Sequence, residues 1–219
     1  MALPVLIIGK SGEGKTYSLK NFQPGEVGII SVEKNRLPFR SELKPVRIPN
    51  YEKQMTEANT YAQVNAAKYA WIERTIEKAA APSIVIDDSQ YLMANELFDR
   101  SGERGYDKFT DIAKNFRNLI HFVNELEDEN KIVYFLHHTE SDGDNREKCK
   151  TIGKMLDEKL CVEGCFNIVL FCQNHEFYTQ GNGMSTAKSP EGMFEQKIPN
   201  DLKAVDTAIR EYYGMTGDG

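Results

Sequence analysis

Short apolar runs recur along the chain, separated by longer segments with helical periodicity. Five runs predict β-strands, at residues 4–8, 26–32, 83–87, 131–137 and 167–173. Each is apolar throughout rather than alternating, which is typical of strands in a parallel sheet covered on both faces. The pattern therefore predicts an α/β fold with a mostly parallel central sheet flanked by crossover helices.

Three other segments predict helices. Residues 51–80 are rich in Ala, Glu, Lys and Gln and contain no Pro or Gly, which favours one helix or two. From Phe109 to Leu126, apolar residues recur at three- and four-residue spacing, as on one face of a helix packed against a sheet. Residues 200–213 predict a closing helix.

The C-terminal third also predicts a β-hairpin, because residues 175–180 and 184–188 flank the turn sequence Gly181-Asn182-Gly183. A chain of 219 residues can bury most of its apolar surface in one core. We therefore expect one domain at 1–213 and a frayed tail at 214–219.

Composition excludes some classes of protein. The net charge of −6 disfavours a wholesale basic surface for nucleic acid, so any DNA contact is expected to be local. The chain contains no run of about 20 apolar residues and no basic segment before its first apolar run, so secretion and membrane insertion are not expected. The cysteines lack C-x-x-C spacing, which favours buried thiols over a zinc site: Cys149, Cys161, Cys165 and Cys172.

A phosphate-binding motif follows the first predicted strand. Residues 9–16, GKSGEGKT, fit G-x-x-x-x-G-K-[ST] between a strand and a helix start. In such a P-loop, backbone N–H groups surround the phosphates, and the lysine reaches the β and γ oxygens. The predicted nucleotide-binding residues are Gly9, Lys10, Ser11, Gly12, Glu13, Gly14, Lys15, Thr16 and the adjoining Tyr17.

A P-loop also needs a magnesium site, because the cation bridges the β and γ phosphates. The Thr16 hydroxyl is one predicted ligand, and Asp87 at the end of the third strand is the other. Asp88 follows directly and has two interpretations: it polarises the attacking water, or it caps the next segment.

Hydrolysis further needs a group that activates water. Glu33 ends the second strand and competes with Asp88 for that role. His137 and His138 close the fourth strand, where a polar side chain can sense the γ-phosphate.

Together with these motifs, several later segments resemble small phage-encoded P-loop ATPases with a RecA-like core, of the single-strand annealing and recombination type. The resemblance covers nearly the whole chain. Besides the P-loop it is carried by VEK at 32–34, IVIDD at 84–88, FLHHTE at 135–140, TIGKML at 151–156, AKSP at 187–190 and IPNDL at 198–202.

The resemblance implies a RecA-like ATPase that uses ATP and Mg²⁺, with Glu33 activating water. It also implies that single-stranded DNA binds two loops, at residues 89–106 and 139–152. Suitable phosphate-pairing or stacking residues there are Arg100, Arg104, Tyr106, Arg146, Lys148, Lys150 and Lys154, with Tyr91 as a further stacking candidate. Acidic residues in the second loop dilute its positive charge, so a merely solvated loop is the alternative.

The family likeness also implies a homo-oligomer, ring or filament, in which Lys188 of one protomer approaches the γ-phosphate of its neighbour. The implied setting is the cytoplasm of an infected bacterium, with a single-strand-binding protein or a nuclease as further partners.

Other classes of P-loop protein remain as alternatives. A small nucleotide kinase has a similar length, but no arginine-rich lid is evident. An AAA+-like ATPase acting on a protein partner would need a further helical domain, for which little chain remains. A GTPase is disfavoured because residues 130–133, NKIV, lack the aspartate of N-K-x-D.

Overall fold

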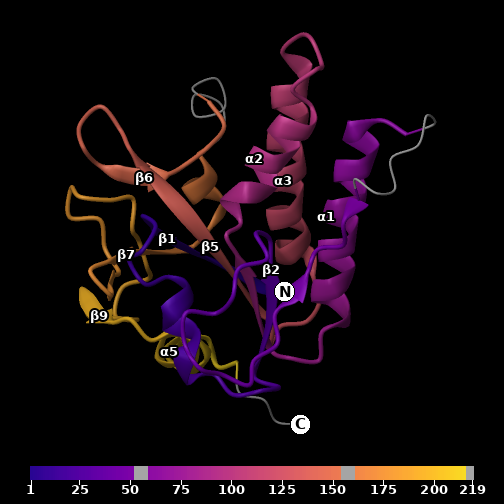
Figure 1. The fold of residues 1–219 in the computed structure, drawn as a ribbon. Helices are drawn as coiled ribbons and strands as arrows, with labels where there is room; N and C mark the ends of the chain where they lie inside the picture. The colour runs from indigo at the N-terminus through magenta and orange to yellow at the C-terminus, as the bar shows by residue number, and fades with distance from the viewer. Residues whose placement is uncertain (52–58, 154–160, 216–219) are drawn as a thin grey trace.

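A mostly parallel sheet forms the centre of the computed structural model, which describes residues 1–51, 59–153 and 161–215 (Figure 1). All five predicted runs form strands: β1 (Leu3–Gly9), β2 (Val27–Ser31), β4 (Ser83–Asp87), β5 (Ile132–Ser141) and β7 (Ile168–Gln173). Their order across the sheet is β2-β4-β5-β1-β7, and all pair in parallel. The predicted α/β class is confirmed.

Short strands extend this parallel core. β3 (Val46–Arg47) adds to β2 in parallel, whereas β8 (Glu176–Tyr178) and β9 (Lys197–Pro199) add antiparallel strands beyond β7. β6 (Glu147–Cys149) pairs antiparallel with the C-terminal end of β5. β1 and β5 lie at the centre, so the loop after β1 is held by the most buried part of the sheet.

Helices cover both faces of the sheet (Figure 1). One face carries α1 (Tyr61–Lys78), α2 (Gln90–Asp99) and α3 (Asp107–Glu125), and the other carries the 3₁₀ helix η1 (Thr16–Asn21) and α5 (Leu202–Tyr213). Alternate residues of β5 divide between the two cores. Phe135 packs with Phe116 of α3, and Leu136 packs in the core that contains Val205 of α5. The remaining described helix is the 3₁₀ helix η3 (Val162–Cys165).

The second part of the segment predicted as one helix or two forms α1, and a capping box sets its start. The Thr60 hydroxyl accepts a hydrogen bond from the backbone N–H of Gln63, and the Gln63 side chain accepts one from the N–H of Thr60. The helix therefore begins at Tyr61. Positions 52–58 of the predicted segment lie outside the described residues.

The first strand of the predicted hairpin forms, but it pairs with other strands than predicted. Asn174 and His175 both have positive φ, 52° and 58°, and form the two-residue connection by which β8 turns back on β7. The other side of β8 pairs with β9, so residues 184–188 do not pair with 175–180. Instead, Ser185 bridges to Glu147, and Lys188 bridges to Val169.

The closing helix is present as predicted. Asp201 caps α5 by accepting hydrogen bonds from the N–H groups of Lys203 and Ala204, and Gly214 ends it with φ of 66°. Residues 216–219 of the predicted tail lie outside the described part of the chain. Among the described helices, none has the length and apolar character needed to cross a membrane.

Candidate functional site: the P-loop and the adjoining strand ends

The P-loop joins the end of β1 to η1 and keeps its lysine inside. The Lys15 ammonium donates hydrogen bonds to the carbonyls of Gly9, at 2.7 Å, and Lys10, at 2.9 Å, and only 6% of the residue is exposed. Burial lowers the pKa of Lys15, opposed by the negative charges of Asp88 and Asp87. The loop thus encloses a cation close enough to those carboxylates to interact with their charge.

The β7–β8 turn and the segment after β9 support the P-loop from one side. The backbone N–H of His175 donates to the Glu13 carbonyl at 3.1 Å, and the N–H of Asn174 donates to the Glu13 carboxylate. The Asn200 side chain donates to the carbonyl of Gly14 at 3.0 Å. Sequence reasoning missed Asn174, His175 and Asn200, since only the fold brings them to the loop.

Thr16 and Asp87, the two predicted magnesium ligands, are brought together from 71 positions apart. The Thr16 hydroxyl donates to Asp87 Oδ1 at 2.9 Å. Burial of Asp87, followed by the adjacent Asp88 charge, raises the pKa of the Asp87 carboxyl to about 6. A divalent cation would relieve both effects, and a hydroxyl beside a carboxylate is an oxygen donor set that suits Mg²⁺.

Asp88 forms a polar cluster with the end of β5. His138 Nε2 lies 3.2 Å from Asp88 Oδ1, and the Asn35 amide donates to Asp88 Oδ2 at 3.3 Å. The hydrogen bond from His138 lowers the pKa of Asp88 despite partial burial. Because β5 lies between β1 and β4, His138 stands between the P-loop and the two aspartates.

His137, in contrast, is a structural histidine. Its ring is buried, with Nδ1 2.9 Å from the Ser89 hydroxyl and Nε2 2.9 Å from the Lys150 carbonyl. Burial lowers its pKa to about 4, so the imidazole is neutral and Nε2 donates to the carbonyl. Of the two predicted histidines, only His138 is directed at Asp88.

The buried His137 should make the folded state sensitive to acid. Below pH 6.5, His137 binds a proton in the unfolded chain. In the folded chain its pKa is about 4, so it stays neutral down to that pH. The free energy of unfolding should therefore fall by about 2 kcal/mol between pH 7 and pH 5 from this residue alone. Urea unfolding of wild type and His137→Gln across that range isolates this effect, because other groups titrate in both. Parallel pH profiles would contradict it.

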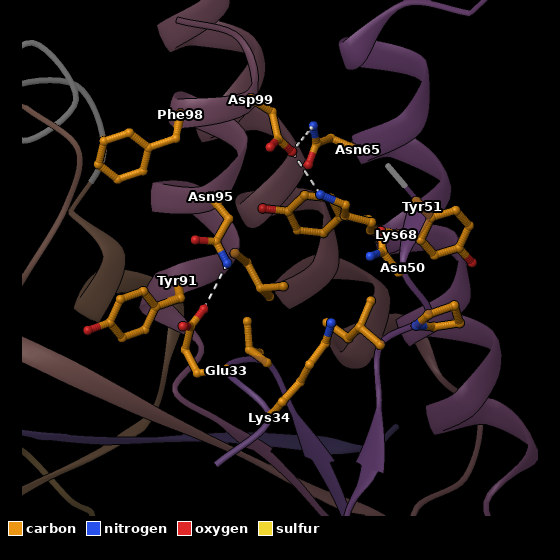
Figure 2. Close-up of a pocket in the computed structure, with 15 residues that line it drawn as sticks. Glu33, Lys34, Asn50, Tyr51, Asn65, Lys68, Tyr91, Asn95, Phe98 and Asp99 are labelled. Carbon is orange, nitrogen blue, oxygen red and sulfur yellow. Dashed lines mark hydrogen bonds and ion pairs between the residues drawn. The ribbon is translucent and has the colours of Figure 1, made fainter. Parts of the chain in front are cut away.

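Glu33, the predicted water activator, is directed at α2 rather than at Asp87 or Asp88. Its carboxylate accepts a hydrogen bond from the Asn95 amide of α2 at 2.8 Å and points toward that helix (Figure 2). It lines a cavity of about 330 Å³ between the end of β2, α1 and α2. Tyr91 of that cavity contacts the His138 ring edge-on, with centroids 5.7 Å apart. The cavity therefore adjoins the Asp88 cluster.

The first predicted DNA-binding loop is mostly helix α2, and its Arg100 is not available. The Arg100 side chain is 4% exposed and pairs with Glu96, Glu103 and Asp111. These three carboxylates raise its pKa although burial alone would lower it. The prediction that Arg100 pairs with DNA phosphates is therefore wrong in this structure. Arg104 and Tyr106 are exposed between α2 and α3, as that role requires.

The second predicted loop is largely a hairpin of β5 and β6. Arg146 donates to the Ser185 carbonyl, and Lys148 pairs with Glu140 at 3.4 Å. Lys150 is exposed, and Lys154 lies outside the described residues. Lys10 of the P-loop pairs with Glu147 of β6 at 2.7 Å, so the hairpin and the phosphate loop are in contact.

Lys188 is not at the end of a strand. It exchanges two backbone hydrogen bonds of 2.8 Å with Val169, which is in register with Leu6 of β1, three residues before the P-loop begins. Its predicted role across a subunit interface stays a prediction.

The cysteines are all free, and two of them are buried. Cys149 and Cys172 are buried as expected, whereas Cys161 is exposed and Cys165 half-buried. No group of metal-ligating side chains of the zinc type occurs among the residues that the structure describes. Neither models of known protein families nor curated protein sequences match this chain.

Proposed function

We propose that this protein is a RecA-like P-loop ATPase that binds and hydrolyses ATP with Mg²⁺ and grips single-stranded DNA according to its nucleotide state. The observation that carries the proposal is the contact between Thr16 and Asp87, beside the buried Lys15. A phosphate loop, its lysine, a hydroxyl and a buried carboxylate are the parts that phosphoryl transfer needs.

The positions of the residues suit them to different roles in binding and hydrolysing ATP. Backbone N–H groups of the P-loop and the Lys15 ammonium would hold the β and γ phosphates, while Thr16 and Asp87 would hold the magnesium ion. Magnesium supplies charge neutralisation between the two phosphates. His138 and Asp88 stand beside this centre, where they can orient water or respond to loss of the γ-phosphate.

Two carboxylates remain candidates for activating water. The contact of Glu33 with Asn95 holds its carboxylate toward α2, whereas Asp88 already interacts with the Lys15 charge. The strand order supports access for both, because β2, β4 and β5 end at the same edge as β1.

A nucleic-acid contact is supported by exposed side chains on both sides of this edge. Arg104 and Tyr106 lie on the α2–α3 connection, and Lys150 follows β6. The overall charge of −6 keeps such a contact local and dependent on salt. Assembly into a ring or filament, host-cytoplasm location and a single-strand-binding or nuclease partner belong to the same proposal.

Steady-state ATP hydrolysis with and without single-stranded DNA, at low and moderate salt, tests this function. We expect Mg²⁺-dependent turnover that DNA stimulates, less so as salt rises. Lys15→Ala should reduce turnover to background, because the γ-phosphate loses its cation.

Two further variants serve as internal comparisons in that assay. Glu33→Gln and Asp88→Asn remove the competing carboxylates without changing shape, and the one that activates water should lose turnover while keeping ATP binding. Steady turnover without DNA stimulation would point instead to a kinase-like or protein-remodelling ATPase. Absence of any Lys15-dependent turnover would contradict the ATPase itself.

A further inference from the structure

A hollow of about 720 Å³ lies beside the P-loop, on the side away from Asp87. Tyr17 and Lys20 of η1 form one wall, His175 of the β7–β8 turn forms another, and Pro199 at the end of β9 and Asn200 after it form the third. The same His175 and Asn200 contact the P-loop at Glu13 and Gly14. The hollow is therefore continuous with the phosphate site.

The order of strands gives the phosphate chain a direction. The Thr16–Asp87 pair would place magnesium, and with it the β and γ phosphates, on the β4 side of β1. β7, β8 and β9 lie on the other side of β1. A nucleotide held with its γ end toward Asp87 extends its α-phosphate and nucleoside toward β7–β9. The hollow lies in that direction, and Tyr17, which follows the last P-loop residue in the sequence, lines it.

The walls have the chemistry that a nucleoside needs. The Tyr17 ring meets His175 edge-on, with centroids 5.7 Å apart, and Phe39 edge-on, with centroids 6.1 Å apart, which makes an aromatic cluster at this wall. The Lys20 ammonium lies 4.5 Å from the centre of the Tyr17 ring. Among the described residues, the exposed His175 imidazole makes this ring contact and no side-chain hydrogen bond. Aromatic rings of this kind stack on bases with little regard to exocyclic groups.

We propose that this hollow binds the nucleoside of the same nucleoside triphosphate whose phosphates occupy the P-loop. Tyr17 stacks on the base, and His175 borders it from the β7–β8 turn. Because stacking depends on ring area, the site selects purines over pyrimidines and distinguishes ATP from GTP only weakly. This inference rests on the proposed function, since the phosphate position sets the direction of the nucleoside.

Binding of three ligands with magnesium separates the base from the phosphates: ATP, CTP and inorganic tripolyphosphate, each measured by titration calorimetry. Wild type should bind ATP more tightly than CTP or tripolyphosphate. Tyr17→Ala and His175→Ala should each weaken ATP binding, the former by about tenfold, and leave tripolyphosphate affinity unchanged. Tyr17→Phe should keep ATP affinity. Tyr212→Ala, an exposed ring on α5 outside the hollow, is the matched control and should change nothing.

The same measurements distinguish failure of the nucleoside site from failure of the proposed ATPase function. If Lys15→Ala abolishes ATP binding but Tyr17→Ala and His175→Ala bind ATP like wild type, the nucleoside lies elsewhere and the inference is overturned. Equal wild-type affinities for ATP and CTP would overturn it as well. If wild type binds neither ATP nor tripolyphosphate, the proposed ATPase function itself is wrong. Retained tripolyphosphate binding also shows that each variant is folded.

Discussion

Replacing Gly14 with alanine should lower ATP hydrolysis by at least about 100-fold, because its backbone conformation disfavours a side chain and a methyl group would displace the two side chains that support the loop. A Cβ there would collide with the Asn200 amide nitrogen and lie 2.6 Å from His175 Nδ1. The residue also has φ of +105°, a conformation that side chains disfavour. The Asn200 and His175 side chains must move away from the loop, the loop loses that support, and the N–H groups proposed to hold phosphate lose their alignment.

Gly12 provides the matched control for this substitution. It also has positive φ, +85°, but a Cβ at Gly12 meets nothing within 4 Å. Gly12→Ala should therefore cost only backbone strain, about 1–2 kcal/mol, and reduce turnover far less. Adding Asn200→Gly to Gly14→Ala removes one of the clashing groups and should restore part of the activity. Wild-type turnover by Gly14→Ala would show that the loop does not bind phosphate in this conformation.

Replacing Arg100 with leucine should have the largest effect on stability, lowering the free energy of unfolding by about 3–5 kcal/mol. The substitution leaves Glu96, whose side chain is fully buried, without its ion pair. Asn115 still donates to the Glu96 carboxylate, but an amide does not neutralise it. Urea unfolding followed by circular dichroism measures the change.

Arg104 and Glu96 supply the comparisons for Arg100. Arg104→Leu changes an exposed arginine on the same connection and should shift stability by less than about 0.5 kcal/mol. The double variant Arg100→Leu, Glu96→Leu should be more stable than Arg100→Leu alone, since no buried charge remains. Single and double variants of equal stability would contradict the assignment of Arg100 as the partner that Glu96 requires.

The five central strands were predictable because both faces of each are buried. Continuous apolar runs such as Val5–Ile8 leave few alternatives to a covered parallel strand, and the structure buries all of that run. The loop of residues 9–16 was equally recognisable as a P-loop motif, since its glycines and lysine follow such a strand directly; that it binds phosphate stays a prediction. The pairing of Thr16 with Asp87 followed from both lying at the same strand edge.

Helix α2 was missed because it lacks a strong local signal. Its N-cap Ser89 makes no side-chain cap bond, and its hydroxyl instead lies within hydrogen-bond distance of the Leu136 carbonyl and His137 Nδ1. Burial of Leu92 and Met93 in the core beneath α2 compensates. Packing of this kind is nonlocal, so the local pattern did not correct the loop at residues 89–106 that the family resemblance implied, with Arg100 as an accessible residue.

The hairpin prediction failed for a related reason. Gly181-Asn182-Gly183 is a good turn sequence, but the Asn174-His175 turn directly after β7 reverses the chain first. After that turn, β8 lies next to β7 at the edge of the sheet. The strand that then pairs with its free side is β9, which comes later in the sequence than residues 184–188.

Local patterns in this chain therefore specified what depends on local burial and backbone geometry: the class of fold, the strands and the glycine-rich loop after β1. The tertiary structure alone decided which side chains are free to act. It buried His137 and Arg100, turned His138 to Asp88, and placed His175 and Asn200 beside the P-loop. These outcomes depend on contacts between residues far apart in sequence, whose free energies arise only when the sheet and helices pack together.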